Sequence, residues 1–184
     1  MADLSADRRP PPFTASAALR LLPPASRHVL RAEPGLLRLA GEALSLSLSM
    51  PPCRASVHGS RAALWLGPDE RLLLSEEASA RDTANHLEQA MRDQPHSLVD
   101  VSHRQVALAI AGPHAATLLA AGCPLDLDAG AFPVGMCTRT VLAKAEIVLW
   151  RVEPDRFHLE VWRSFAAYVS AVIAEAVHDL APAG

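Results

Sequence analysis

The chain has 184 residues, of which 50% are hydrophobic and 4% aromatic, and its formal net charge is −3. This length is enough for one compact domain or for two small halves that share a core of mainly Ala, Leu and Val. The small net charge gives no support for a nucleic-acid partner or a charged membrane surface. Three cysteines, no apolar leader and no run long enough to cross a bilayer predict a soluble, cytoplasmic protein.

The first 26 residues are expected to form a flexible arm because they include three consecutive prolines, with a short helix only at 14–22. A strand at 27–32 then opens the folded part, and Pro34 stands where a first helical turn accepts proline. Hydrophobic spacing and turn residues predict the elements that follow. They are, in order, a helix at 34–43, an extended segment at 45–49, a loop at 50–60, a hairpin of 62–66 and 71–74, a helix at 76–91 and a strand at 98–101.

The rest of the chain shows a similar alternation of strands and helices. The expected elements are a strand at 105–110, a helix at 113–122, strands at 138–142, 147–152 and 157–162, and a helix at 164–180. The last helix is predicted to begin at the N-cap Ser164 and to turn one apolar face inward. That face consists of Phe165, Tyr168, Val169, Val172, Ala176 and Leu180.

An internal repeat is visible in this order of elements. Trp65 and Trp150 each precede an arginine by six residues, in a hairpin that is followed by an amphipathic helix, so we expect them at equivalent positions. Two strand–helix–strand–strand–helix units, at about 27–91 and 98–180, then form a single compact domain over 27–184. The predicted fold class is α+β, with duplicated units that form mixed sheets and carry helices on one face.

Few residues are arranged for catalysis. Asp100 and His103 are three apart, but strand alternation places them on opposite faces, so we expect polar groups at a strand end instead of an acid–base pair. Cys53, Cys123 and Cys137 lack the spacing of a zinc site, and no Gly-rich phosphate loop is present. The sequence therefore predicts no catalytic, cofactor-binding or metal-binding residue in this chain.

Tryptophan and arginine are the residue types most enriched at the energetic centres of protein interfaces. Several of them lie close together in the C-terminal part of the chain. The candidates for a subunit interface are Trp162, Arg163, Trp150, Arg151 and Arg156. For Trp162 and Arg163, burial in the core and exposure at an interface are equally open.

Five motifs follow one another between residues 122 and 166. They are Gly-Cys-Pro-Leu-Asp-Leu from Gly122, Ala-Phe-Pro-x-Gly from Ala131, Thr-Arg-Thr-x-Leu-Ala-Lys from Thr138, Leu-Trp-Arg from Leu149 and Trp-Arg-Ser-Phe-Ala from Trp162. Together they resemble the gamma subunit of heterotetrameric sarcosine oxidase. The resemblance extends over roughly residues 61–180, whereas residues 1–60 match poorly.

Two further segments, Asp-Val-Ser-His from Asp100 and Ala-Gly-Pro-x-Ala-Ala-x-Leu-Leu from Ala111, are similar to the aminomethyltransferase of the glycine cleavage system. This second likeness covers roughly residues 98–175 and implies the folate-binding aminomethyltransferase fold. That family has a Gly-rich hairpin with aspartates used in folate chemistry, and no such hairpin lies between Ala143 and Ile147 here. No residue of this chain therefore inherits that role.

The first resemblance implies a non-catalytic structural subunit of an enzyme that oxidatively demethylates sarcosine to glycine, with formation of hydrogen peroxide and methylene-tetrahydrofolate. It implies that other subunits hold FAD, FMN, NAD, tetrahydrofolate and zinc: alpha binds folate and NAD, beta binds flavin and delta binds zinc. This chain is then expected to contact mainly the alpha subunit, with no nucleic acid or membrane as partner. A free-standing folate-dependent aminomethyltransferase-like enzyme and a related folding or repair factor stay open as alternatives.

Overall fold

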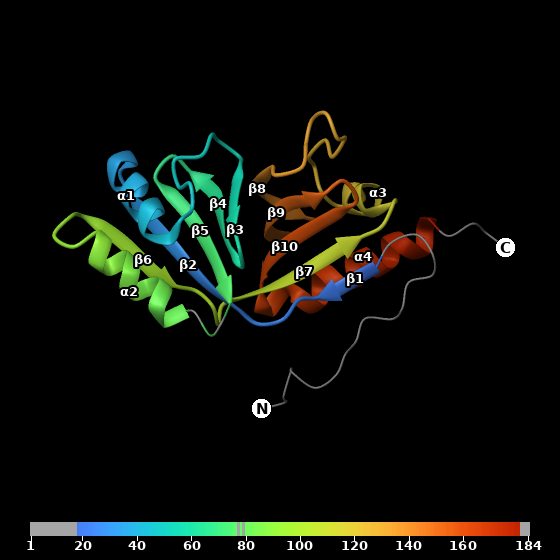
Figure 1. Cartoon of the computed structure of the whole chain (residues 1–184). Helices are drawn as coiled ribbons and strands as arrows, with labels where there is room; N and C mark the ends of the chain where they lie inside the picture. The colour runs from blue at the N-terminus through green and yellow to red at the C-terminus, as the bar shows by residue number, and fades with distance from the viewer. Residues whose placement is uncertain (1–17, 77, 79, 181–184) are drawn as a thin grey trace, which may run out of the picture.

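The chain folds around two sheets of five strands each, which lie side by side between two pairs of helices (Figure 1). The computed structural model describes residues 18–76, 78 and 80–180. The N-terminal sheet consists, from edge to edge, of β3 (Ala55–His58), β4 (Arg61–Gly67), β5 (Glu70–Glu76), β2 (Ala25–Ala32) and β6 (His96–Asp100). The C-terminal sheet consists of β8 (Cys137–Leu142), β9 (Ala145–Glu153), β10 (Arg156–Trp162), β7 (Gln105–Ala111) and β1 (Ala18–Leu21).

Each sheet carries two helices on one face. The N-terminal sheet is covered by α1 (Pro34–Leu44) and α2 (Ala80–Ala90), and the C-terminal sheet by α3 (Ala115–Ala120) and α4 (Ala166–Leu180). Leu37 of α1 and Leu87 of α2 are buried in one cluster with Leu30 of β2. Ile173 of α4 is buried in a second cluster with Ile110 of β7. The amphipathic helices thus supply one core for each sheet.

A third apolar cluster joins the two sheets through their helix-free faces. Its buried members are Ala62, Leu64, Leu72, Leu74, Val101, Cys137 and Val148. Strand β5 is therefore buried on both faces, since Leu72 and Leu74 meet the other sheet while Leu73 meets the helices. Burial on both faces explains why this strand is a continuous leucine run instead of an alternating one.

The two sheets have the same strand order. Read from one edge, β3-β4-β5-β2-β6 corresponds to β8-β9-β10-β7-β1, so that α1 corresponds to α3 and α2 to α4. The two outer strands are exchanged: β6 immediately precedes β7 in the chain but pairs with β2, and β1 precedes β2 but pairs with β7. This order accords with the repeat seen in the sequence. The division into two halves at 27–91 and 98–180 within one compact domain stays a prediction.

The β4–β5 and β9–β10 hairpins can be aligned by their bulges. This alignment differs by one residue from the alignment of their tryptophans. In the N-terminal sheet the bulge separates the turn from the pair Trp65–Arg71. In the C-terminal sheet the bulge separates the turn from the pair Arg151–Phe157. Trp65 thus corresponds to Arg151, and Trp150 lies one residue earlier. The two tryptophans occupy corresponding strands, β4 and β9, but the expectation that their positions are equivalent is wrong by one residue.

Two expectations about the sheets are corrected by the strand pairing. All pairings between the described strands are antiparallel, so the sheets are not mixed. The loop expected at 50–60 contains β3, because Ala55–His58 pairs with the edge of β4. An edge strand with little apolar content gives a weak signal in the sequence, since only one of its sides is hydrogen-bonded.

Two further corrections concern shorter segments. The helix expected at 14–22 is wrong where the structure describes it, because 18–21 is β1, and the predicted arm at 1–26 is therefore partly strand. The other part of that arm, residues 1–17, lies outside the described residues. The segment 45–49 is a loop and not a strand: Ser45 ends α1 with a left-handed φ of 56°, and Leu46 and Leu48 turn into the core.

The last helix buries a narrower face than the sequence predicts. Val169 and Ala176 are buried as expected, whereas Phe165 and Tyr168 are 41% and 37% exposed. The segment Arg163–Phe165 is a 3-10 turn and α4 begins only at Ala166, so Ser164 lies within the turn instead of at the N-cap. Of the other residues expected inward, Val172 is partly buried, and the side chain of Leu180 lies outside the described residues.

Candidate interaction surface

A buried ion pair connects the two sheets through their helix-free faces. Glu160 of β10 has no exposed side-chain surface, and its Oε2 accepts a hydrogen bond of 2.5 Å from Nε of Arg27 on β2. His158 Nε2 lies 2.7 Å from the other oxygen and donates to it, because a carboxylate only accepts. Burial by itself raises the pKa of Glu160, but the bonds from His158 and Arg27 lower it overall. Glu160 is thus a compensated structural anion and not a general base.

A second carboxylate, Glu70 of β5, connects the same two sheets near their other end. Arg31 of β2 donates to it at 2.6 Å, and Arg139 of β8 binds both of its oxygens. Burial raises the pKa of Glu70, and the two arginines lower it overall. Each sheet therefore contributes one buried carboxylate, and an arginine of the other sheet pairs with it. Both pairs fix the angle between the sheets.

Two buried arginines stabilise the β4–β5 and β9–β10 turns through hydrogen bonds to backbone carbonyls. Arg71 donates to the carbonyl oxygens of Leu48, Gly67 and Glu70. Arg151 donates to the carbonyl oxygens of Leu127, Phe132 and Pro154. In each half the guanidinium thus joins a hairpin turn to the loop that follows the corresponding helix. Arg151 is only 6% exposed and its guanidinium donates to these carbonyls, so in this chain it has a structural role, and its expected place at a subunit interface stays a prediction.

Trp150 is also a packing residue. It contacts the inter-sheet cluster, and its ring lies 5.6 Å from that of His158. Its Nε1 is buried and has no hydrogen-bond partner in the described part of the chain. Because the side chain is partly buried against this cluster, the core interpretation fits Trp150 better than the interface interpretation.

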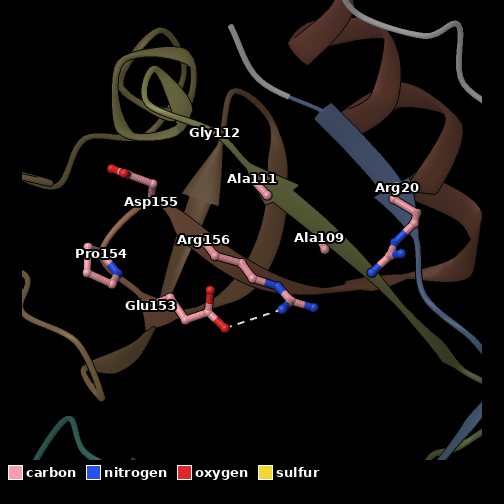
Figure 2. Close-up of a pocket in the computed structure, with 8 residues that line it drawn as sticks. All are labelled: Arg20, Ala109, Ala111, Gly112, Glu153, Pro154, Asp155 and Arg156. Atoms are coloured by element: carbon pink, nitrogen blue, oxygen red, sulfur yellow. Dashed lines mark hydrogen bonds and ion pairs between the residues drawn. The ribbon is translucent and has the colours of Figure 1, made fainter. Parts of the chain in front are cut away.

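Arg156 borders a hollow of about 580 Å³ on the helix-free face of the C-terminal sheet, beside the β9–β10 turn. Figure 2 shows Arg20 and Arg156 reaching toward the same space across Ala109, with Glu153 paired to Arg156 and Asp155 turned away. The wall consists of alanine, glycine, proline and charged side chains. It lacks the large apolar and aromatic residues that line most small-molecule pockets. Arg156 stays accessible to a partner, but the hollow does not have the lining of a cofactor site.

Trp162 and Arg163 lie at the surface, which answers the question that the sequence leaves open. Trp162 is 42% exposed, and the guanidinium of Arg104 lies 5.2 Å from its ring centre. Arg163 donates from its backbone to the Arg104 carbonyl oxygen and from Nε to that of His103. The exposed rings of Phe165 and Tyr168 follow directly, with their centres 6.4 Å apart and edge to face. An ordered aromatic and basic surface therefore surrounds the C-terminal end of β10.

A small cavity of about 160 Å³ lies between the sheets next to Trp162. Val29, Leu66 and Leu72 line it from the N-terminal sheet, and Arg139, Glu146, Ile147, Val148 and Glu160 line it from the C-terminal sheet, beside Arg104, Gln105 and Trp162. Gln105 is 7% exposed, and its Oε1 has no partner among the described residues. This volume is below that of pockets for cofactor-sized ligands.

The polar groups of the Asp100–His103 segment serve the turn between β6 and β7. Asp100 Oδ1 accepts from the backbone N–H of Ser102 at 2.8 Å and from its hydroxyl. These two hydrogen bonds lower the pKa of Asp100, and the bond from the Ser102 hydroxyl has the larger effect. The hydroxyl oxygen of Ser102 in turn accepts from the Arg27 backbone N–H. No hydrogen bond joins Asp100 to His103 in the described structure, so the segment is built as a turn and not as an acid–base pair.

The cysteines are free thiols with packing roles. Cys137 is fully buried in the inter-sheet cluster, and burial raises its pKa to about 12. Cys123 is buried in the C-terminal core, and Cys53 is partly buried. Within residues 18–76, 78 and 80–180, no three His, Cys, Asp or Glu side chains gather in a way that could hold a metal ion. None of the described helices is long and apolar enough to cross a membrane.

Sequence reasoning missed several residues that shape this surface. Arg104, Phe165 and Tyr168 are not among the expected interface residues, and the last two are assigned to the core by helical spacing. The signal for the buried ion pair is visible in retrospect: Glu160 stands between Leu159 and Val161 in a strand buried on both faces. A carboxylate in such a strand needs a buried cation, but the sequence does not say which of the 17 basic residues supplies it.

Comparisons with known proteins agree with the motifs. The model of the "Sarcosine oxidase, gamma subunit family" matches residues 31–179. The chain belongs to this family. The sarcosine oxidase subunit gamma of Corynebacterium sp. (strain P-1) is 31% identical over 166 residues, which are 89% of this chain and 81% of that protein. The subunit gamma of Arthrobacter sp. is 36% identical over 147 residues, 78% and 71% of the two chains. Because the family match begins at residue 31, the expectation that residues 1–60 match poorly is wrong for 31–60.

Solved structures extend this finding to the fold. A chain of the heterotetrameric sarcosine oxidase from Corynebacterium sp. U-96, in complex with pyrrole 2-carboxylate, superposes with a TM-score of 0.84 at 29% identity. The match covers 91% of this chain and 87% of that one. The glycine cleavage system aminomethyltransferase T from Bartonella henselae has a TM-score of 0.63 at 16% identity, and the match covers 88% of this chain but 46% of that one. The α+β fold of the sarcosine oxidase gamma subunits and its likeness to the aminomethyltransferase fold are confirmed.

Proposed function

We propose that this chain is the gamma subunit of a heterotetrameric sarcosine oxidase and acts in assembly instead of in the chemical step. The family match over residues 31–179 carries the first part of this proposal. The similar structure is itself that of a heterotetrameric sarcosine oxidase, and the match covers 87% of that chain. The enzyme in which the chain takes part is then an oxidoreductase.

The second part, a non-catalytic role, is supported by how the reactive groups are used. Glu70 is paired with two arginines, Glu160 is paired with Arg27 and hydrogen-bonded by His158, and Asp100 is bonded into a turn. The thiol of Cys137 has its pKa raised to about 12 by burial, which keeps it protonated at neutral pH. These four groups are satisfied by contacts within the described part of the chain, which supports a structural role for each of them.

The remaining assignments follow the resemblance. The assembled enzyme oxidatively demethylates sarcosine to glycine, releases hydrogen peroxide and forms methylene-tetrahydrofolate. FAD, FMN, NAD, tetrahydrofolate and zinc are held by the alpha, beta and delta subunits, and this chain packs mainly against alpha in the cytoplasm. A free-standing aminomethyltransferase is not favoured, because the chain spans less than half of the transferase whose fold it shares.

Co-expression with the other three subunits tests this proposal. Affinity purification through a tag on the beta subunit is expected to recover this chain in a constant ratio to the others, in a complex with sarcosine-dependent peroxide formation. Omission of the chain is expected to lower the yield of intact complex. If the other three subunits assemble to the same yield and the chain is absent from the purified complex, the proposal is wrong.

A further inference from the structure

The surface at the C-terminal end of β10 is built from three aromatic and three basic residues. The aromatic residues are Trp162, Phe165 and Tyr168, and the basic residues are Arg104, Lys144 and Arg163. We call this set the basic aromatic surface. It draws on β10, the turn before β7, the β8–β9 turn and the start of α4, so residues far apart in the chain meet there.

Contacts between its members hold this surface in one conformation. Arg104 lies over the Trp162 ring, and its carbonyl oxygen accepts a hydrogen bond of 2.9 Å from the Arg163 N–H. The backbone N–H of Lys144 donates to the Tyr168 hydroxyl at 3.4 Å, and Tyr168 packs edge to face on Phe165. A surface that is ordered before binding loses less conformational entropy when a partner docks.

Each aromatic ring leaves between 37% and 42% of its residue exposed. Helical spacing directs α4 toward the core, yet Phe165 and Tyr168 turn outward in the 3-10 turn and the first turn of the helix. Large side chains that are adjacent, ordered and incompletely buried are typical of protein–protein contact sites. Tyr and Trp suit such sites because one end is apolar and the other is polar.

The cavity of about 160 Å³ between the sheets borders this surface, since Arg104 and Trp162 line it. Its lining is mixed, because Leu66 and Val148 are apolar whereas Gln105, Arg139 and Glu146 are polar or charged. The volume is of the order of a single amino-acid side chain and not of a cofactor. The cavity thus offers a place for one anchoring side chain next to the aromatic rings.

The charge of the basic aromatic surface indicates the charge of the partner that it can bind. Arg104, Lys144 and Arg163 form no ion pair within the described part of the chain, and neither does Glu146, which lines the adjacent cavity. The nearby Glu160 is paired with Arg27, and Glu70 is paired with Arg31 and Arg139. The surface is therefore basic on a chain whose net charge is −3. Such a patch favours an oppositely charged partner.

We propose that the basic aromatic surface docks an acidic segment of a partner subunit, which inserts one side chain into the cavity beside Trp162. This inference rests on the proposed function and adds to it the surface used and the chemistry of the segment. The acidic side chains pair with Arg104, Arg163 and Lys144, while the anchor displaces water from the cavity. The aromatic rings are then covered on the sides that they expose in the free chain.

Charge reversal in the co-expressed complex tests this inference. Arg104→Glu combined with Arg163→Glu is compared with Arg81→Glu combined with Arg92→Glu, which makes the same charge change on exposed arginines at α2 and just after it. The first pair of substitutions is expected to weaken retention of the chain at least tenfold in a salt-titrated pull-down. The control pair is expected to stay within about twofold of the parent. Circular dichroism and thermal unfolding of the free chains check that both variants fold.

Hydrogen exchange supplies an independent readout on the parent. Amides at 141–146 and 162–168 are expected to exchange more slowly in the complex than in the free chain at low concentration. If the Arg104–Arg163 variant is folded and retained like the control, or if these amides are unchanged, the inference is overturned while the proposed function stands. Protection that appears in the free chain as its concentration rises assigns the surface to a second copy and also overturns it. If the parent binds none of its partners, the proposed function fails as well.

Discussion

Glu160→Gln is the substitution with the largest expected effect on the stability of this fold. It removes the charge of a carboxylate whose side chain has no exposed surface but keeps its size. Arg27, with 3% of its side chain exposed, then stays charged without its counter-ion between the two sheets. Such an uncompensated cation costs more than the lost attraction, because it cannot recover its hydration.

The expected loss in unfolding free energy is about 3–5 kcal/mol, the range found when one partner of a buried ion pair is removed. For a chain of this size that corresponds to a fall in the melting temperature of roughly 6–20 °C. Glu153→Gln is the matched control, because Glu153 and Arg156 are paired with side chains 59% and 39% exposed. An exposed pair contributes about 0–1 kcal/mol. The double variant Arg27→Met with Glu160→Leu is expected to be more stable than Glu160→Gln alone, since it leaves no buried charge unpaired.

The difference in unfolding free energy between the parent and Glu160→Gln is expected to depend on pH in a defined direction. The pKa of Glu160 is lower in the folded protein than in the unfolded chain, so the unfolded chain binds more protons as the pH falls. The stabilisation by the carboxylate is therefore fully present above its unfolded pKa and is lost as the pH falls through the folded pKa. Urea unfolding of parent and Glu160→Gln should differ by a constant amount above about pH 6 and converge below about pH 4. A variant within 1 kcal/mol of the parent at pH 7, or a difference that grows toward acid, refutes this account of the pair.

Three further outcomes are expected. Arg151→Ala should lower the unfolding free energy by about 1.5–3 kcal/mol, because it removes charged donors from buried carbonyls; equal stability by urea unfolding would contradict its role as a structural fastener. Iodoacetamide at pH 8 should modify Cys53 in the native chain but spare Cys137, whose pKa is about 12; mass spectrometry that finds equal rates at both thiols would show that the two sheets separate readily. Trp162→Ala should lower the yield of intact complex several-fold by size-exclusion chromatography, whereas Leu39→Ala, a residue 40% exposed on α1, should not. A reversed order of these two yields would place the interface elsewhere.

Local patterns in the sequence predict much of this fold. The hairpin of β4 and β5, the three strands β8 to β10, and helices α1 and α4 each lie within a few residues of their expected ranges. The motifs between 122 and 166 identify the family correctly. What these features share is that turn chemistry and hydrophobic period act over short distances.

The errors arise where distant parts of the chain decide the structure. Strand β1 lies next to a proline-rich segment, and only pairing with β7, some 90 residues away, makes it a strand. The shared spacing predicts that the hairpins align by their tryptophans, whereas the bulges align Trp65 with Arg151. Helical spacing assigns Phe165 to the core, and the 3-10 turn rotates it outward. The sequence likewise does not identify the partner of Glu160, because residues that pair across two sheets have no characteristic spacing in the sequence.

The central claim is that this chain supports sarcosine oxidation without supplying a reacting group, and turnover per assembled complex tests it most directly. Sarcosine-dependent peroxide formation, normalised to the flavin content of purified complex, should be measured for His103→Ala, Asp100→Asn and Cys123→Ser. We expect the turnover of each variant to stay within a few-fold of that of the parent. Asp100 is hydrogen-bonded within a turn, Cys123 packs in the C-terminal core, and His103 forms no hydrogen bond with either side chain in the described structure. A true general base or nucleophile costs on the order of 100-fold or more when removed. A fall of that size in any of the three, with assembly and flavin intact, would show that the chain reaches into the active site.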